Sequence, residues 1–214
     1  MKIQNIKTLA VFILFGTQIY AQTPLTTVLD KLQTAWDQSK NYKAEFKQTI
    51  FSKKLHTKDE TTGTIFVSKP GKIRWEIPAQ RMVQILNGNR LTQIKENRRR
   101  KTTVVDIYKD VSKSVDLKSL AFLAGTASFK ETYQSALGEE DLEKIDLKFS
   151  LKNSPDESYL AEIDKKSYLL RALTTETADS KVRIEFTKTE LNTEVDPNLF
   201  EYKPKPKDIV HENP

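Results

Sequence analysis

The sequence predicts an α+β protein that is mainly β: an open antiparallel β-barrel, or half-barrel, of about nine to eleven strands with helices covering its concave apolar face. Apolar and charged residues alternate with a period of two over most of the chain, which is typical of half-buried strands. Short turn signals such as Asn87-Gly88 join these runs, without the crossover helices that parallel strands need. Apolar residues at helical spacing occur only near the N-terminus and in the middle of the chain.

The first 21 residues have the pattern of a secretory signal peptide. Lys2 and Lys7 give a basic start, and the apolar stretch Leu9–Phe15 is shorter than the roughly 20 residues that span a membrane. Cleavage is expected after the small residue Ala21, and a membrane anchor or a buried helix is the alternative. No Cys follows the stretch to carry an N-terminal lipid. We therefore expect a soluble, exported protein in the periplasm or outside the cell, with residues 22–214 forming one domain.

The chain after this segment opens with a predicted helix over residues 24–39. Thr23 is placed as the N-cap and Pro24 at the first helical position. Apolar residues then recur at steps of three and four from Leu25 to Trp36, which predicts one buried stripe.

From residue 42 to residue 110 the period is two. In the first strand, Tyr42, Ala44 and Phe46 share one face, and charged residues alternate with them on the other. Further strands are predicted over 64–68, 72–77, 81–86, 91–95 and 101–108.

The second half of the chain begins with a change of pattern between residues 116 and 137. Asp116 as a cap and Gly125 as a stop predict a short helix with an unusually apolar surface. Four strands are then predicted over 141–151, 158–164, 167–174 and 181–188. After Phe200 the tail is rich in proline, so we expect it to be extended and partly mobile.

The composition excludes most kinds of catalytic site. The chain has no Cys, and its two His residues, His56 and His211, are too far apart to suggest a metal cluster. Its six Gly residues form no hydrolase elbow, phosphate-binding loop or dinucleotide fingerprint. The acidic pairs Glu139-Glu140 and Asp156-Glu157 lie in polar turns, although a hydrolase using them is an alternative. We expect no enzymatic activity, no cofactor and no metal.

The charge pattern has one dense feature, the basic run Arg98-Arg99-Arg100-Lys101, in a chain of net charge +6. A nucleic-acid site would need interleaved aromatic residues, which the run lacks. The alternatives are a solvated hairpin loop and a docking surface for an acidic partner or anionic lipid headgroups.

Several blocks of this sequence resemble one known family. They are Phe46-Lys47-Gln48, Gly63, the segment Lys69–Glu76 with its Lys-Pro-Gly-Lys-Ile-Arg-Trp sequence, Asn87-Gly88 and the closing segment Asp196–Pro204. Together they are similar to the periplasmic outer-membrane lipoprotein carrier family, LolA. The resemblance extends over nearly the whole chain after the predicted signal peptide.

The resemblance implies a monomeric carrier in the periplasm that binds the acyl chains of lipoproteins in a hydrophobic cavity. An inner-membrane lipoprotein-releasing ABC transporter complex would load it, and an outer-membrane acceptor or the membrane itself would take the cargo. A sensor of lipids or lipoproteins on the same half-barrel, without a transport role, is the alternative.

The candidate site residues follow from the strand faces and from the resemblance. In the family, the basic residue before the proline holds the lid, and Lys69 occupies that position here. Phe66 and the arginines Arg98, Arg99 and Arg100 are candidates for docking. Each cavity candidate could also be ordinary core. The predicted lipid-binding residues are Phe46, Ile50, Ile65, Ile73, Trp75, Met82, Leu120, Phe122 and Leu123.

Overall fold

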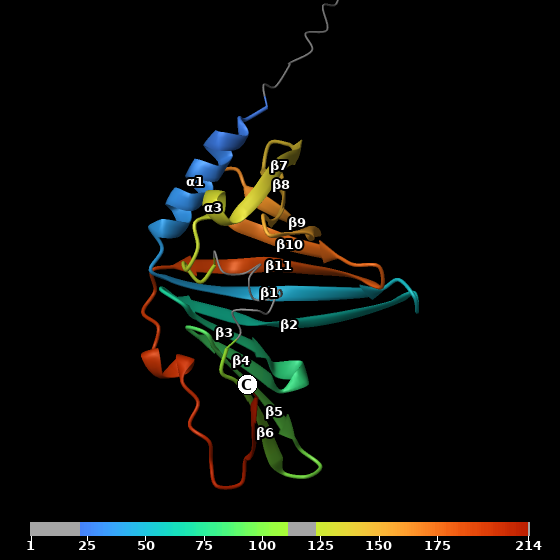
Figure 1. Ribbon diagram of the computed structural model, residues 1–214, viewed down its shortest axis with the longest axis vertical. Coiled ribbons are helices and arrows are strands. Elements are labelled where there is room, and N and C mark those ends of the chain that lie inside the picture. Colours follow the sequence, from blue (N-terminus) through green and yellow to red (C-terminus); the bar gives the residue numbers. More distant parts are fainter. Residues whose placement is uncertain (1–21, 111–122, 214) are drawn as a thin grey trace, which may run out of the picture.

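The protein is built around one open sheet, shown in Figure 1. The computed structural model describes residues 22–110 and 123–213. Within these ranges, twelve strands form a single sheet in the order β12-β6-β5-β4-β3-β2-β1-β11-β10-β9-β8-β7, which does not close into a barrel. The prediction of a mainly β, open half-barrel with helices is therefore confirmed.

The elements are as follows. The helices are α1 (Leu25–Asp37), η1 (Pro78–Gln80), α3 (Phe129–Thr132) and η2 (Pro197–Phe200). The strands are β1 (Asn41–Ser52), β2 (Thr57–Ser68), β3 (Lys72–Ile77), β4 (Met82–Asn87), β5 (Arg90–Asn97), β6 (Thr102–Tyr108), β7 (Tyr133–Glu140), β8 (Lys144–Leu151), β9 (Ser154–Asp164), β10 (Leu170–Glu176), β11 (Ser180–Leu191) and β12 (Ile209–Asn213). Among the described residues, no helix is both long enough and apolar enough to cross a membrane.

Helix α1 forms where its apolar spacing predicts it, but its cap differs from the prediction. Thr23 does not cap the helix: its backbone N–H and hydroxyl donate to the Glu140 carboxylate at 2.8 and 2.7 Å. Pro24 precedes the helix without a side-chain cap hydrogen bond. The N-terminal end of α1 is thus attached to β7 rather than capped locally.

The sheet has two differently covered faces. We call the face on which α1 packs the inner face and its apolar residues the inner cluster. Figure 1 shows α1 and α3 together beside the β7–β10 end of the sheet. The inner cluster includes Val28, Leu29, Leu32, Trp36, Tyr42, Phe46, Ile65, Ile73, Trp75, Leu123, Phe149 and Phe186.

The opposite, outer face carries a smaller cluster on β4, β5 and β6. Ile85, Ile94, Val105 and Ile107 pack there around Phe200, which is only 2% exposed. The Asp196 side chain caps η2 by accepting a hydrogen bond from the Asn198 backbone N–H at 2.9 Å. Phe200 is the last residue of η2, and its ring packs in this cluster. The segment after β11 therefore covers the outer face.

Two strand predictions need correction. Residues 129–140 form α3 and β7, where no strand was predicted, because Ala136 and Gly138 leave little apolar alternation to recognise. The tail forms β12, which pairs with β6 in parallel, so the sheet is not wholly antiparallel and has more strands than expected. The short helix predicted from Asp116 falls mainly in 111–122, outside the described residues.

We predict that replacing Phe200 with Ala destabilises the fold, because it empties the centre of the outer cluster. Removing a buried phenyl ring costs about 3 to 5 kcal/mol, and urea unfolding would measure this loss. Phe51→Ala is the matched control, since Phe51 is 37% exposed and its loss should cost only about 1 to 2 kcal/mol. Equal losses in the two variants would contradict the role of Phe200.

Candidate functional site

The centre of the inner face is an aromatic group contributed by three strands. The Phe46 ring from β1 lies 4.4 Å from the Trp75 ring of β3, centroid to centroid. Phe186 from β11 meets the same indole edge to face at 6.4 Å. Such pairs add about 0.5 to 1.5 kcal/mol to the free energy of burying the rings.

This arrangement requires a glycine in the strand between the first two rings. Gly63 of β2 is the direct register partner of Phe46. A Cβ atom at Gly63 would lie 2.5 Å from the Phe46 ring and 2.0 Å from the Glu76 carbonyl oxygen. The missing side chain is what lets the Phe46 ring cross β2 and reach Trp75.

The apolar surface of the inner face ends part of the way across the sheet. Along one cross-strand row, Ile65 pairs with Trp75, Trp75 with Gln84, and Gln84 with Gln93. The row continues to Asp106, whose carboxylate lies 2.9 Å from Nδ1 of His211 in β12. The inner face is therefore apolar up to β3 and mixed in polarity from β4 onward.

Two described segments cover this face. Helix α1 buries Val28, Leu29, Leu32 and Trp36 in the inner cluster. The second covering segment consists of residues 123–125. Leu123 is 1% exposed, and the Ala124 carbonyl accepts a hydrogen bond from the Gly71 N–H at 2.8 Å. The turn between β2 and β3 thus holds the second covering segment through its backbone.

Lys69 connects both covering segments to the sheet. Its ammonium group donates a hydrogen bond to the Trp36 carbonyl at the end of α1 and lies 4.7 Å from the centroid of the Trp36 ring. Its aliphatic stem passes Gly125, where an added Cβ would come within 2.7 Å of the stem. Burial lowers the pKa of Lys69, although the nearby Asp37 carboxylate opposes the shift.

Most of the predicted cavity residues are brought together by the fold. Phe46, Ile65, Ile73, Trp75 and Leu123 belong to the inner cluster, and Met82 packs against it. None of the five is more than 9% exposed, so the inner face is closed in this structure. Ile50 is half-buried in β1 between Val182 and Asp59, nearer the tip of the β1–β2 hairpin. Leu120 and Phe122 lie outside the described residues.

The candidate docking residues are separated. Phe66 packs against the outer cluster, beneath the segment that carries Phe200, and is half-buried there. Arg98, Arg99 and Arg100 are exposed in the turn between β5 and β6. The two groups do not form one surface.

Several inner-cluster residues were missed by the sequence reasoning. Phe186 is the most important, because it completes the aromatic group around Trp75. The sequence contained a signal for it, because Val182, Ile184 and Phe186 alternate with charged residues in the strand predicted over 181–188. What the alternation could not reveal was which strand pairs with β1.

In the first acidic pair, Glu140 is held in structural contacts. Burial raises the pKa of Glu140, but hydrogen bonds from Lys165 and Thr23 outweigh this effect and hold it below the usual value. Lys165 contacts the Glu140 carboxylate at 2.6 Å. Among the described residues, no three His, Cys, Asp or Glu side chains gather as a metal site would require.

Comparison with known proteins gives a consistent result. The model of the family described as outer membrane lipoprotein carrier protein LolA matches residues 37–203. A carrier of this description from Dechloromonas aromatica is 39% identical over 49 residues, which cover 23% of this chain and 24% of the relative. This alignment spans about a quarter of that relative's length.

A solved structure shares the fold at low sequence identity. An uncharacterized conserved protein from Thermus thermophilus has 10% identity and a TM-score of 0.51, with 88% of this chain and 98% of that chain covered. A LolA superfamily protein from Nitrosomonas europaea has 8% identity and a TM-score of 0.46, with 85% of this chain and 99% of that chain covered.

We predict that Gly63→Ala displaces the Phe46 ring and destabilises the protein by about 1 to 3 kcal/mol, as overpacking of a core does. Urea unfolding would measure the loss, and near-ultraviolet circular dichroism would report the changed environment of Trp75. Gly138→Ala is the control, because an added Cβ there comes no closer than 3.0 Å to Asp146. An unchanged spectrum in the Gly63 variant would show that the ring does not depend on the glycine.

Proposed function

The chain belongs to the LolA family of outer membrane lipoprotein carrier proteins, and we propose that it is a periplasmic chaperone that binds the acyl chains of lipoproteins on its inner face. In this proposal the protein receives lipoproteins at the inner membrane and delivers them to the outer membrane. The acyl chains would contact the aromatic group of Phe46, Trp75 and Phe186.

The observation that carries the proposal is a continuous apolar face under a cover made of separate segments. The inner cluster joins strands from β7 to β4, while its cover consists of separate segments that do not belong to the sheet. Displacing a cover of this kind leaves the hydrogen bonds of the sheet intact. Acyl chains could then replace the apolar side chains of the cover.

The energetics favour partial burial of the cargo. Each buried methylene contributes about 0.8 kcal/mol, so a chain of about 15 methylenes would be held by on the order of 12 kcal/mol if fully buried. Release at the outer membrane would then be very slow. The free energy needed to open the cover reduces this affinity to a level that permits transfer.

Lys69 is the proposed latch. Its hydrogen bond to the Trp36 carbonyl joins α1 to the turn before β3, and its stem packs against Gly125 in the second covering segment. Breaking this one side-chain contact removes the link that Lys69 makes to both segments, and leaves the apolar packing of α1 and the hydrogen bond between Gly71 and Ala124 to be displaced by the cargo. A lysine offers a single flexible ammonium group and not a planar fork, so this latch rests on one donor group and not on paired N–H donors.

The proposed partners follow from family membership. They are acylated lipoproteins, the inner-membrane lipoprotein-releasing ABC transporter complex and an outer-membrane acceptor or the membrane. Burial of acyl chains involves no covalent step, so the proposed role is binding and protein transport in outer-membrane biogenesis, and not enzymatic. Export by cleavage after Ala21 would place the protein in the periplasm.

The decisive experiment is purification from the periplasm, followed by a search for a co-eluting acylated lipoprotein in a water-soluble complex. Failure to keep any such cargo in solution would overturn the proposal. Depletion separates a carrier from a sensor, because only loss of a carrier makes lipoproteins accumulate at the inner membrane.

We predict that Trp75→Asp abolishes capture of the acylated lipoprotein, because it places a charge on the inner face. Trp75→Phe is the control and should keep at least half of the capture, since it preserves an aromatic side chain. Thermal unfolding of both variants separates lost binding from lost folding. Normal capture by a stably folded Trp75→Asp protein would show that acyl chains bind elsewhere.

We predict that Lys69→Met, which keeps the stem but removes the donor, makes the cover easier to open and strengthens acyl binding by about tenfold. The reason is that a hydrogen bond from a charged donor contributes about 1.5 to 3 kcal/mol to the closed state. Fluorescence titration with a labelled acyl peptide measures the affinity. Lys40→Met is the control, because Lys40 is exposed and its hydrogen bonds to described residues come from its backbone. Equal affinities of the two variants for the acyl peptide would show that Lys69 does not hold the cover closed.

A further inference from the structure

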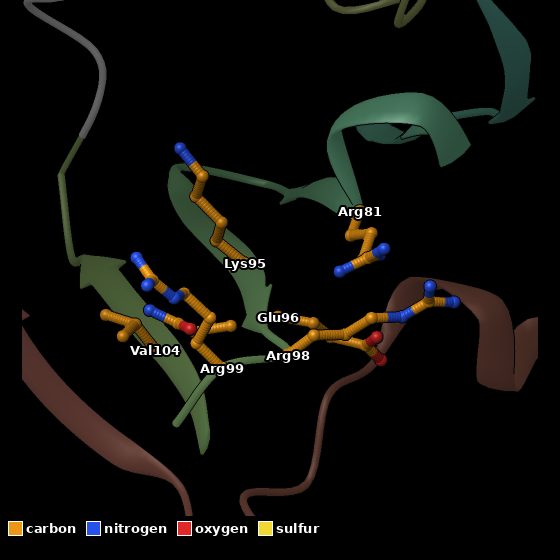
Figure 2. A pocket seen from close by; sticks show the side chains of 7 residues that line it. Arg81, Lys95, Glu96, Arg98, Arg99 and Val104 are labelled. Carbon is orange, nitrogen blue, oxygen red and sulfur yellow. The ribbon is translucent and has the colours of Figure 1, made fainter. Parts of the chain in front are cut away.

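A basic pocket of about 320 Å³ lies at the tip of the β5–β6 hairpin, apart from the aromatic group of the inner face. Figure 2 shows its lining, which comes from the turn after η1, from β5, from the β5–β6 turn and from β6. The residues that matter here are Arg81, Lys95, Glu96, Arg98, Arg99 and Val104.

Backbone hydrogen bonds hold the elements of this pocket together. The Arg81 carbonyl accepts a hydrogen bond from the Glu96 N–H at 3.2 Å, which joins the turn after η1 to β5. Within the β5–β6 turn, the Asn97 side chain accepts from the Arg100 N–H at 3.2 Å, and the Arg98 carbonyl accepts from the Lys101 N–H at 3.3 Å. The turn is therefore an ordered support for Arg98 and Arg99.

The charges of the pocket are not balanced within the described part of the protein. The lining contains four cationic side chains and a single carboxylate, that of Glu96. Figure 2 shows Arg81 and Arg98 on the side of Glu96, and Lys95 and Arg99 on the other side of β5. No ion pair between described residues involves Arg81, Lys95, Arg98 or Arg99, whereas Arg183 pairs with both Glu162 and Glu185. Four cations at one hairpin tip, none of them in an ion pair between described residues, give this tip a positive potential that favours a bound anion.

We propose that this pocket binds the phosphate groups of anionic phospholipids and docks the protein on a membrane surface. Guanidinium groups match phosphate oxygens with paired N–H donors, and a lysine adds a compact positive charge. The volume is at the small end of the range for ligand pockets, about 300 to 1,000 Å³. It suits a headgroup, with the apolar side chain of Val104 next to the glycerol carbons.

The position of Lys95 favours a lipid over a soluble acidic partner. Lys95 pairs across the sheet with Met82 on one side and with Val104 on the other, so it shares their face. Met82 packs against the inner cluster, and the pocket therefore borders the apolar face. If the tip of the β5–β6 hairpin is bound to lipid headgroups, the inner face lies close to the bilayer.

This docking is separate from the binding of cargo, so its test needs no lipoprotein.

The test is flotation of the purified protein with vesicles of phosphatidylcholine alone or mixed with phosphatidylglycerol. We expect binding only to the mixed vesicles, weakening as the salt concentration rises. A basic residue near an anionic membrane strengthens binding about fivefold, so Arg98→Gln/Arg99→Gln should weaken it about 25-fold. Both side chains are exposed, and the thermal unfolding midpoint should not change.

The control variant, Lys148→Gln/Lys166→Gln, removes the same charge from exposed positions in β8 and in the turn before β10. It should weaken vesicle binding less than twofold. Equal losses in the two variants would overturn the proposal, because they would show a response to net charge alone. Equal binding to both kinds of vesicle, or to neither, would also overturn it.

Two soluble probes separate the sources of the anion. Binding of inorganic phosphate without vesicle binding, or arginine-dependent binding of an acidic peptide in place of vesicles, would each overturn docking on lipid. Loss of cargo capture with intact vesicle binding would instead overturn only the carrier function proposed above.

Discussion

The contact between Phe46 and Trp75 across Gly63 is the constraint on which the rest of the structure depends. Strand β1 pairs along its length with β2 on one side and β11 on the other, so it joins the two halves of the sheet. The Phe46 ring ties this central strand to β3 by crossing β2. The same ring forms the middle of the apolar face, and stability and the candidate site therefore share one set of side chains.

A sheet with one apolar face must be covered, because exposing a large apolar surface to water is unfavourable. On the outer face, the cover is the segment that inserts Phe200 and ends in β12, which is bonded into the sheet. On the inner face, the described cover adds no strand to the sheet and is attached through its two ends, by Thr23 to Glu140, Lys69 to Trp36 and Gly71 to Ala124. The contrast between a cover that is paired into the sheet and one that is not is why we propose the inner face as the one that opens.

The sequence could predict elements whose information is local. The alternation of Ile73, Trp75 and Ile77 and the turn at Asn87-Gly88 placed β3, β4 and β5 correctly. Strand β12 could not be predicted, because five residues behind a proline-rich stretch become a strand only where β6 offers an unpaired edge. The basic run was visible, but its neighbours Arg81 and Lys95 join it only through strand register.

The two proposed binding regions use different physical forces, and this difference is useful to a carrier. Burial of acyl chains depends little on ionic strength and requires the cover to open, whereas attraction of the basic pocket to headgroups acts through charge while the cover is closed. A protein can thus reach a membrane before it exposes any apolar surface to water. Because Lys95 lies beside Met82 at the border of the inner face, cargo leaving that face has a short path to the bilayer on which the protein is docked.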